Sequence, residues 1–198
     1  MAKARDIPGL EAQLPYGEAA ARTVAVRAEE LFDHAAGVLD TTDIERVHDM
    51  RVATRRLRAV LEIYEPCFPR KQLRSVLADV KALADSLGER RDPDVQLAQL
   101  EEFASAVKPA DRPGVEVFAE RVRAEQGTAN QTLGAALAAL EESDLRGRLA
   151  ALAASAEDDG PSASDSPWPE GLPRPEADGP SQESDPPALD APGRWTPS

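Results

Sequence analysis

Residues 42–66, TDIERVHDMRVATRRLRAVLEIYEP, give the strongest structural signal in the chain, because they predict a complete amphipathic helix. Thr42 and Glu45 have the spacing of a capping box, in which both side chains accept hydrogen bonds from free amides at the helix start. Pro66 ends the helix because it has no amide hydrogen to continue it. At 100° per residue the apolar side chains gather on one face, as in a helix packed on a core: Met50, Ala53, Leu57, Val60, Leu61 and Tyr64.

The sequence on both sides of this helix indicates an all-α protein. Ala, Leu, Arg and Glu, which favour helices, dominate residues 1–154, and no run alternates apolar and polar residues as a strand does. Gly88 is placed as a C-cap, and Asp92 as an N-cap before Pro93, so a third helix ends where a fourth begins. Short connections between amphipathic helices predict an antiparallel helical bundle. The expected helices cover residues 17–38, 42–64, 70–87, 92–106, 113–142 and 144–154.

Charge and proline are concentrated at the C-terminal end. The 198 residues contain 23 Lys+Arg and 36 Asp+Glu, a net charge of −13. Residues 155–198 alone contain 10 acidic and 2 basic side chains and 10 of the 17 prolines. Such a segment cannot bury enough apolar surface to offset the entropy of ordering it. We therefore expect a flexible N-terminus (residues 1–14), a helical domain (15–154) and a disordered, acidic, Pro-rich tail (155–198).

Hydropathy and cysteine content favour a cytoplasmic protein. No apolar run approaches the ~18 residues that a membrane span needs, and the first residues lack the apolar stretch of a signal peptide. We therefore expect no membrane partner. The single cysteine, Cys67, excludes an internal disulfide and a cysteine-rich metal site.

The polar face of the 42–66 helix carries a line of cations. With His48 set at 0°, Arg51, Arg55 and Arg58 fall at about 300°, 340° and 280°; we call these four residues the basic row. The row spans about 15 Å at 1.5 Å per residue, and Glu62 is the acidic residue at its end. Guanidinium groups in line suit an extended, multiply charged anion, whereas a single phosphate needs converging donors. The surrounding residues 46–91 contain 11 basic and 6 acidic side chains.

The residues alone leave several interpretations of this surface open. A basic helix face is often only solvated surface. It also suits a helical interaction protein whose basic face binds an acidic protein partner. Nucleic acid is less favoured, because no aromatic side chain interleaves with the basic row to stack on bases.

Two segments, VHDMRVATRRLRAVLEIYEP (47–66) and LADVKALADSLGERRDPDVQLAQL (77–100), resemble the CHAD family, the conserved histidine α-helical domain. The family pattern is a histidine with an arginine three residues on, an Arg-Arg-Leu-Arg cluster, a later lysine, and an Arg-Asp followed by Asp-Val. The resemblance covers about residues 15–154. It implies a helical domain that binds inorganic polyphosphate in a basic channel, in some cases on polyphosphate granules. The ligand contacts that it implies are His48, Arg51, Arg55, Arg58, Lys81 and Arg91, with Arg56 and Arg90 as further candidates.

The chain departs from the family pattern in one respect. CHAD domains are usually built from two related four-helix halves, each with its own histidine-and-arginine helix, and this sequence has one such helix. The resemblance therefore leaves three possibilities: a homodimer that completes the channel, an open surface that binds weakly, or a decayed remnant.

The sequence indicates no catalysis and no cofactor. A metal-dependent phosphohydrolase needs several histidines and carboxylates, whereas this chain has only His34 and His48. It has no glycine-rich loop ending in Gly-Lys-Ser/Thr to hold a nucleotide phosphate. Cys67 has no histidine nearby in sequence to activate it, so a packing role is favoured.

Overall fold

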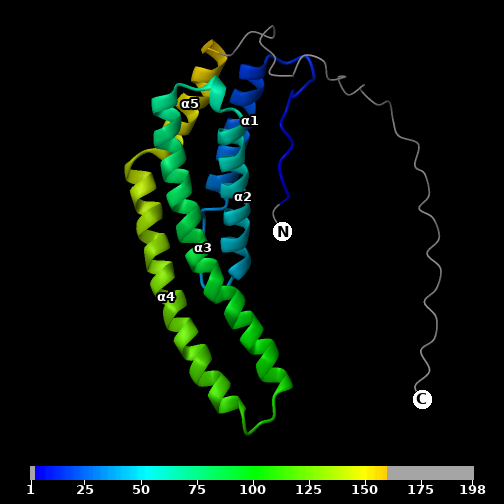
Figure 1. The fold of residues 1–198 in the computed structure, drawn as a ribbon, viewed down its shortest axis with the longest axis vertical. Helices are drawn as coiled ribbons and strands as arrows, with labels where there is room; N and C mark the ends of the chain where they lie inside the picture. Colours follow the sequence, from blue (N-terminus) through cyan, green and yellow to red (C-terminus); the bar gives the residue numbers. More distant parts are fainter. Residues whose placement is uncertain (1–2, 160–198) are drawn as a thin grey trace, which may run out of the picture. The chain divides into compact units, whose positions relative to one another are not determined.

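The computed structural model describes residues 3–159, and every regular element in that part of the chain is helical (Figure 1). The predicted all-α class is therefore confirmed. The elements are α1 (Tyr16–Asp33), α2 (Ile44–Ile63), a short 3₁₀ helix η1 (Glu65–Cys67), α3 (Arg70–Ala106), α4 (Arg112–Glu142) and α5 (Leu145–Asp159).

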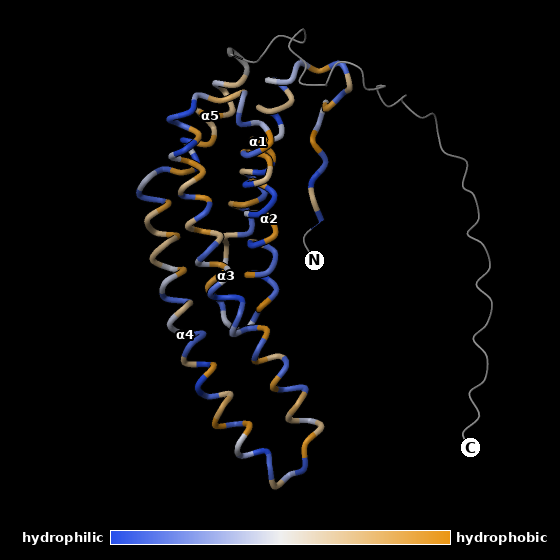
Figure 2. The backbone as a smooth tube through the Cα atoms, viewed as in Figure 1, coloured by the Kyte–Doolittle hydropathy of each residue, from blue (hydrophilic) through white to orange (hydrophobic). Residues whose placement is uncertain are grey.

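The helices form an antiparallel bundle whose core lies between α1, α2, α3 and α5. Helix α1 packs against α2 and α5, and α3 packs against α2 and α4. Leu31, Leu57, Leu83 and Leu152, one from each of the four helices, are completely buried in this core. Each such leucine contributes about 1.5–3 kcal/mol by leaving water. The C-terminal half of α3 and the N-terminal half of α4 extend past the other helices as a hairpin (Figure 1). Hydrophobic and hydrophilic residues are interspersed along every helix (Figure 2).

The prediction of two separate helices over residues 70–87 and 92–106 is wrong, because a single helix, α3, covers both ranges. It is continuous from Arg70 to Ala106, so Gly88 is not a C-cap and Asp92 is not an N-cap. Pro93 lies inside the helix and is buried. A proline within a helix costs about 3 kcal/mol. The helix nevertheless continues because its buried side chains persist through this region, where α4 packs along it.

Two helix ends beside the α1–α2 connection also differ from the sequence prediction. Helix α1 ends at Asp33 rather than near residue 38, and a turn with Gly37 at φ +73° follows. Helix α2 begins after Asp43, because the Thr42 hydroxyl donates to Asp40 Oδ1 at 2.7 Å instead of forming a capping box.

At the C-terminal end, α5 continues to Asp159, beyond residue 154, where the sequence predicts the last helix to end. Residues 160–198 of the predicted tail lie outside the described residues.

The segment before α1 has no regular element but contacts α1. The Arg5 backbone amide donates to Glu30, and the Arg5 guanidinium pairs with Asp33. Arg22 donates to the Pro8 carbonyl at 3.3 Å. These contacts lie within the segment for which the sequence predicts a flexible N-terminus.

The hydropathy of the helices does not fit a membrane span: across residues 3–159, no helix is long and apolar enough to cross a membrane.

Candidate functional site

Helix α2 presents the basic row on its outer face. Arg51 and Arg55 are exposed, and His48 and Arg58 are partly buried. Met50, Ala53 and Leu57, on the other side of the helix, are fully buried. The structure therefore confirms the division of α2 into a core face and a cationic face. The burial of the apolar side fixes which way the arginines point, because rotating the helix would expose these core residues.

The cations of the basic row differ in how they are paired. Within residues 3–159, Arg51 and Arg55 form no ion pair. Arg58 Nε donates to Glu62 Oε1 at 3.0 Å, one turn further along α2. The hydrogen bond from Arg58 holds the pKa of Glu62 below its usual range, with further contributions from the charges of Arg58 and Lys81. The row thus has an uncompensated middle and one neutralised end.

Helix α3 brings two more cations to this face, one toward each end of the row. Lys81 Nζ lies 3.6 Å from Glu62 Oε1, at the Arg58 end. Arg91 Nη1 donates to the Ile44 carbonyl at 3.2 Å, at the first residue of α2 and one turn before His48. We call the basic row together with Lys81 and Arg91 the basic surface. The antiparallel packing of α2 and α3 explains why two residues ten positions apart on α3 reach opposite ends of it.

Small residues on α3 separate these two cations. Ala84 and Gly88 follow Lys81 at helical spacing and share its strip of α3 with Arg91. Both are partly exposed. A methyl group added at Gly88 would meet no neighbouring atom within 4 Å. The α3 side of the basic surface therefore carries no bulky side chain at these two positions.

Arg56 belongs to a different face of α2. It is partly buried, and its charge acts on Glu30 of α1. Burial opposes ionisation of Glu30, but hydrogen bonds from Arg5 and Arg27, with the charges of Arg27 and Arg56, hold the pKa of Glu30 below its usual range. Arg27 Nη1 lies 2.6 Å from Glu30 Oε2. Arg56 therefore acts electrostatically on the interface between α1 and α2, to one side of the basic row.

Arg90 is not brought together with the basic surface. It is completely buried, and its guanidinium pairs with Asp94 one turn further along α3. Arg90 Nε also donates to Asn130 Oδ1 at 3.0 Å, and Gln126 Nε2 donates to Asp94 Oδ1 at 2.6 Å. Both amide residues come from α4. In this structure Arg90 is a structural cation between α3 and α4 and is out of reach of an external ligand.

The buried network extends to the loop before α2. Asn130 Nδ2 donates to the Leu39 carbonyl at 3.0 Å, so the Arg90 network connects the α3–α4 hairpin to the α1–α2 connection. This role of Arg90 is absent from the sequence predictions. One signal was available: Arg90 and Asp94 continue the stripe of Leu83 and Leu87 at helical spacing and have the i,i+4 relation of an ion pair.

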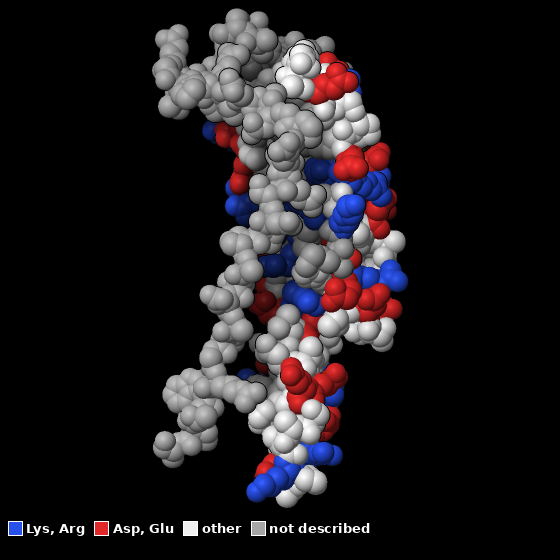
Figure 3. Space-filling view, turned by 90° about the vertical axis from the view of Figure 1, so that its right-hand side faces the viewer, with Lys and Arg blue, Asp and Glu red and all other residues white. Residues whose placement is uncertain are grey.

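The charge on the visible surface is mixed. Figure 3 shows Lys and Arg side chains in the upper half of the face turned to the viewer and at its lower tip, with Asp and Glu side chains beside them. No uniformly basic face is visible in this view.

Cys67 is the single thiol of the chain. Cys67 is buried, and burial raises the pKa of its thiol. Its side chain is part of the hydrophobic core, as expected for a packing residue. Across residues 3–159, no three His, Cys, Asp or Glu side chains are grouped so as to hold a metal ion.

The fold and the basic surface define an all-helical bundle protein with cations arranged in line on one helix. The chain belongs to the CHAD family, because the family model described as CHAD domain matches residues 22–188. The match begins inside α1 and continues beyond residue 154, where the sequence analysis ends the domain. No curated protein gives a significant match to the chain.

Proposed function

We propose that this chain binds inorganic polyphosphate on the basic surface and does not convert it chemically. One observation carries the proposal: Arg51 and Arg55 lie one turn apart on α2, both exposed, and neither pairs with a carboxylate within the described residues. Membership of the CHAD family supports a ligand of the polyphosphate type.

The geometry favours an extended anion over a compact one. The row is about 15 Å long at 1.5 Å per residue, and Lys81 and Arg91 lie toward its two ends. A guanidinium group offers a planar pair of donors that matches two phosphate oxygens. Successive phosphates of one chain can therefore meet successive cations, whereas a single phosphate reaches only one or two of them.

Counterion release gives the proposal its characteristic salt dependence. Each phosphate that a cation neutralises releases bound counterions, so affinity falls steadily as salt concentration rises. The slope of the logarithm of affinity against the logarithm of salt concentration reports the number of contacts. We expect that number to fall when arginines of the row are removed.

The test is a titration of labelled long-chain polyphosphate into the full chain at two salt concentrations. The triple variant with Arg51, Arg55 and Arg58 changed to Ala should lose most of the affinity and part of the salt dependence. A matched control carries the same loss of charge on α4, where Arg112, Arg121 and Arg123 are all exposed. This control should bind nearly as wild type. If both variants lost the same affinity, the binding would depend only on total charge, which would contradict the proposal.

Three further measurements distinguish the alternatives. RNA and single-stranded DNA, supplied at equal phosphate concentration, should bind more weakly than polyphosphate. An acidic protein partner whose binding is lost on Arg51→Glu but is unaffected by added polyphosphate would favour the interaction-protein alternative. Sedimentation of the chain with and without polyphosphate shows whether one copy or two form the binding unit.

A further inference from the structure

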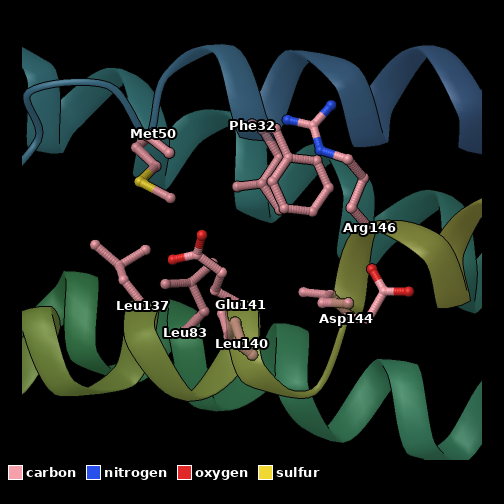
Figure 4. Close-up of a pocket in the computed structure, with 11 residues that line it drawn as sticks. Phe32, Met50, Leu83, Leu137, Leu140, Glu141, Asp144 and Arg146 are labelled. Carbon is pink, nitrogen blue, oxygen red and sulfur yellow. The ribbon is translucent and has the colours of Figure 1, made fainter.

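A cavity of about 510 Å³ lies on the other side of α2 from the basic surface. The C-terminal ends of α1 and α4, the start of α5 and the middle of α2 and α3 all contribute to it (Figure 4). On α2 the lining residue is Met50, which is on the core face. The volume falls within the range of about 300–1,000 Å³ found for small-molecule sites.

The floor of this cavity is apolar. Leu31, Met50 and Leu83 line it and are themselves almost completely buried, and Leu137 of α4 closes one side. A ligand that covers this floor must therefore present an apolar body, since a polar body would lose hydrogen bonds to water without replacement.

Two of the three charged side chains around the cavity are already engaged. Asp144 Oδ1 accepts from the Gly147 amide at 3.0 Å and so caps α5. The guanidinium carbon of Arg146 lies 4.2 Å from the centroid of the Phe32 ring. In Figure 4 the guanidinium lies beside Phe32, away from Glu141. In Figure 4 the charged ends of both residues lie on the far side of the cavity from Met50 and Leu137.

Glu141 is the remaining charged residue. The residue is exposed, and its carboxylate lies over the cavity, between Met50, Phe32 and Leu137 (Figure 4). Within residues 3–159 its side chain forms no ion pair or hydrogen bond. A carboxylate above an apolar floor is complementary to a cation that carries an apolar body.

We propose that this cavity is a binding site for a small organic cation, an alkyl- or arylalkylammonium compound, whose ammonium group pairs with Glu141 and whose apolar part covers Met50 and Leu83. The proposal is independent of polyphosphate binding, because the two sites share no residue and prefer ligands of opposite charge. It adds a second ligand class to a chain whose other candidate site attracts anions.

The probe for the test is 4-phenylbutylammonium chloride, titrated calorimetrically into the full chain. The neutral 4-phenylbutan-1-ol and the anionic 4-phenylbutyrate have nearly the same shape and serve as ligand controls. We expect the ammonium compound to bind with a dissociation constant below about 1 mM, the alcohol several-fold more weakly and the acid most weakly. Methyl resonances of Leu137 and Ala35 should shift during the titration, which places the probe in the cavity.

The variant Glu141→Gln separates charge recognition from shape. It should weaken binding of the ammonium compound about 2- to 5-fold, as expected for an exposed ion pair, and leave binding of the alcohol unchanged. Glu142→Gln removes the neighbouring exposed carboxylate, which does not line the cavity, and should change neither. Ala35→Phe fills the cavity and should weaken both compounds, with thermal unfolding checking that the variant is folded.

Several results would overturn the proposal. These are equal binding of the ammonium compound and the alcohol, an equal effect of Glu141→Gln and Glu142→Gln, or no binding at millimolar concentration by a folded wild-type chain. Polyphosphate binding measured on the same samples is unaffected by any of them, so the two proposals fail separately.

Discussion

Arginine residues in this chain occupy two opposite environments, one exposed and one buried. Arg51 and Arg55 on α2 are exposed and have no carboxylate partner within the described residues, whereas Arg90 on α3 is completely buried and held by Asp94, Asn130 and α4. Both lie within the two segments that resemble the CHAD family, although the family's Arg-Asp pair is Arg91-Asp92 and Arg90 is the residue before it. The comparison shows that position in such a segment does not distinguish an exposed arginine without a carboxylate partner from one that holds two helices together. Burial and pairing make that distinction.

The largest expected effect is on stability, from Arg90→Ala. Removing one partner of a buried ion pair leaves an uncompensated charge in the interior, which costs about 3–5 kcal/mol. Asp94 would be left in that position between α3 and α4. Urea denaturation followed by circular dichroism measures the loss.

The paired control replaces both charges, as Arg90→Met with Asp94→Leu, and should recover most of the stability because no isolated charge remains. A destabilisation below about 1 kcal/mol for Arg90→Ala alone would mean that the buried pair does not hold α3 to α4.

The second prediction expects little change in stability and a large change in polyphosphate affinity, the reverse of the first. Replacing Arg51 and Arg55 with Ala should leave the free energy of unfolding within about 0.5 kcal/mol, because neither side chain has a partner to lose. The same change should lower the affinity for polyphosphate about tenfold or more, since two charge-assisted contacts disappear. Urea denaturation and the titration of labelled polyphosphate, on one preparation, give both numbers. A double variant that is less stable but binds polyphosphate as tightly as wild type would contradict both expectations.

The two groups also differ in how far the sequence predicted them. The face of α2 that carries Arg51 and Arg55 followed directly from helical periodicity, because Met50 and Leu57 had to face the core. The role of Arg90 did not follow. Gly88 and Pro93 are strong local signals for a helix end, and they placed Arg90 in a connection between two helices. Packing against α4 overrides those signals, and such packing comes from residues far away in sequence, such as Asn130.

The third effect concerns Glu62, which neutralises one end of the basic surface. It pairs with both Arg58 and Lys81 and competes with phosphate for them. Glu62→Gln should therefore raise the affinity for polyphosphate by several-fold, at a cost in stability within about 0.5 kcal/mol because the paired side chains are each 44% exposed to solvent. Glu65→Gln is the matched control, since Glu65 is exposed and pairs with no cation within the described residues. Unchanged affinity in Glu62→Gln would show that bound polyphosphate does not reach the Arg58 end.

The smallest effect is at Gly88, on the α3 side of the basic surface. Gly88→Ala should stabilise the chain by about 0.5–1 kcal/mol, because glycine within a helix is disfavoured and the added methyl group meets nothing within 4 Å. It should leave polyphosphate affinity unchanged, whereas Gly88→Glu should lower it by placing a carboxylate on the strip between Lys81 and Arg91. Thermal unfolding and the polyphosphate titration test both variants. If Gly88→Glu binds as tightly as wild type, polyphosphate contacts the α2 row alone, and the cations of α3 lie outside the binding surface.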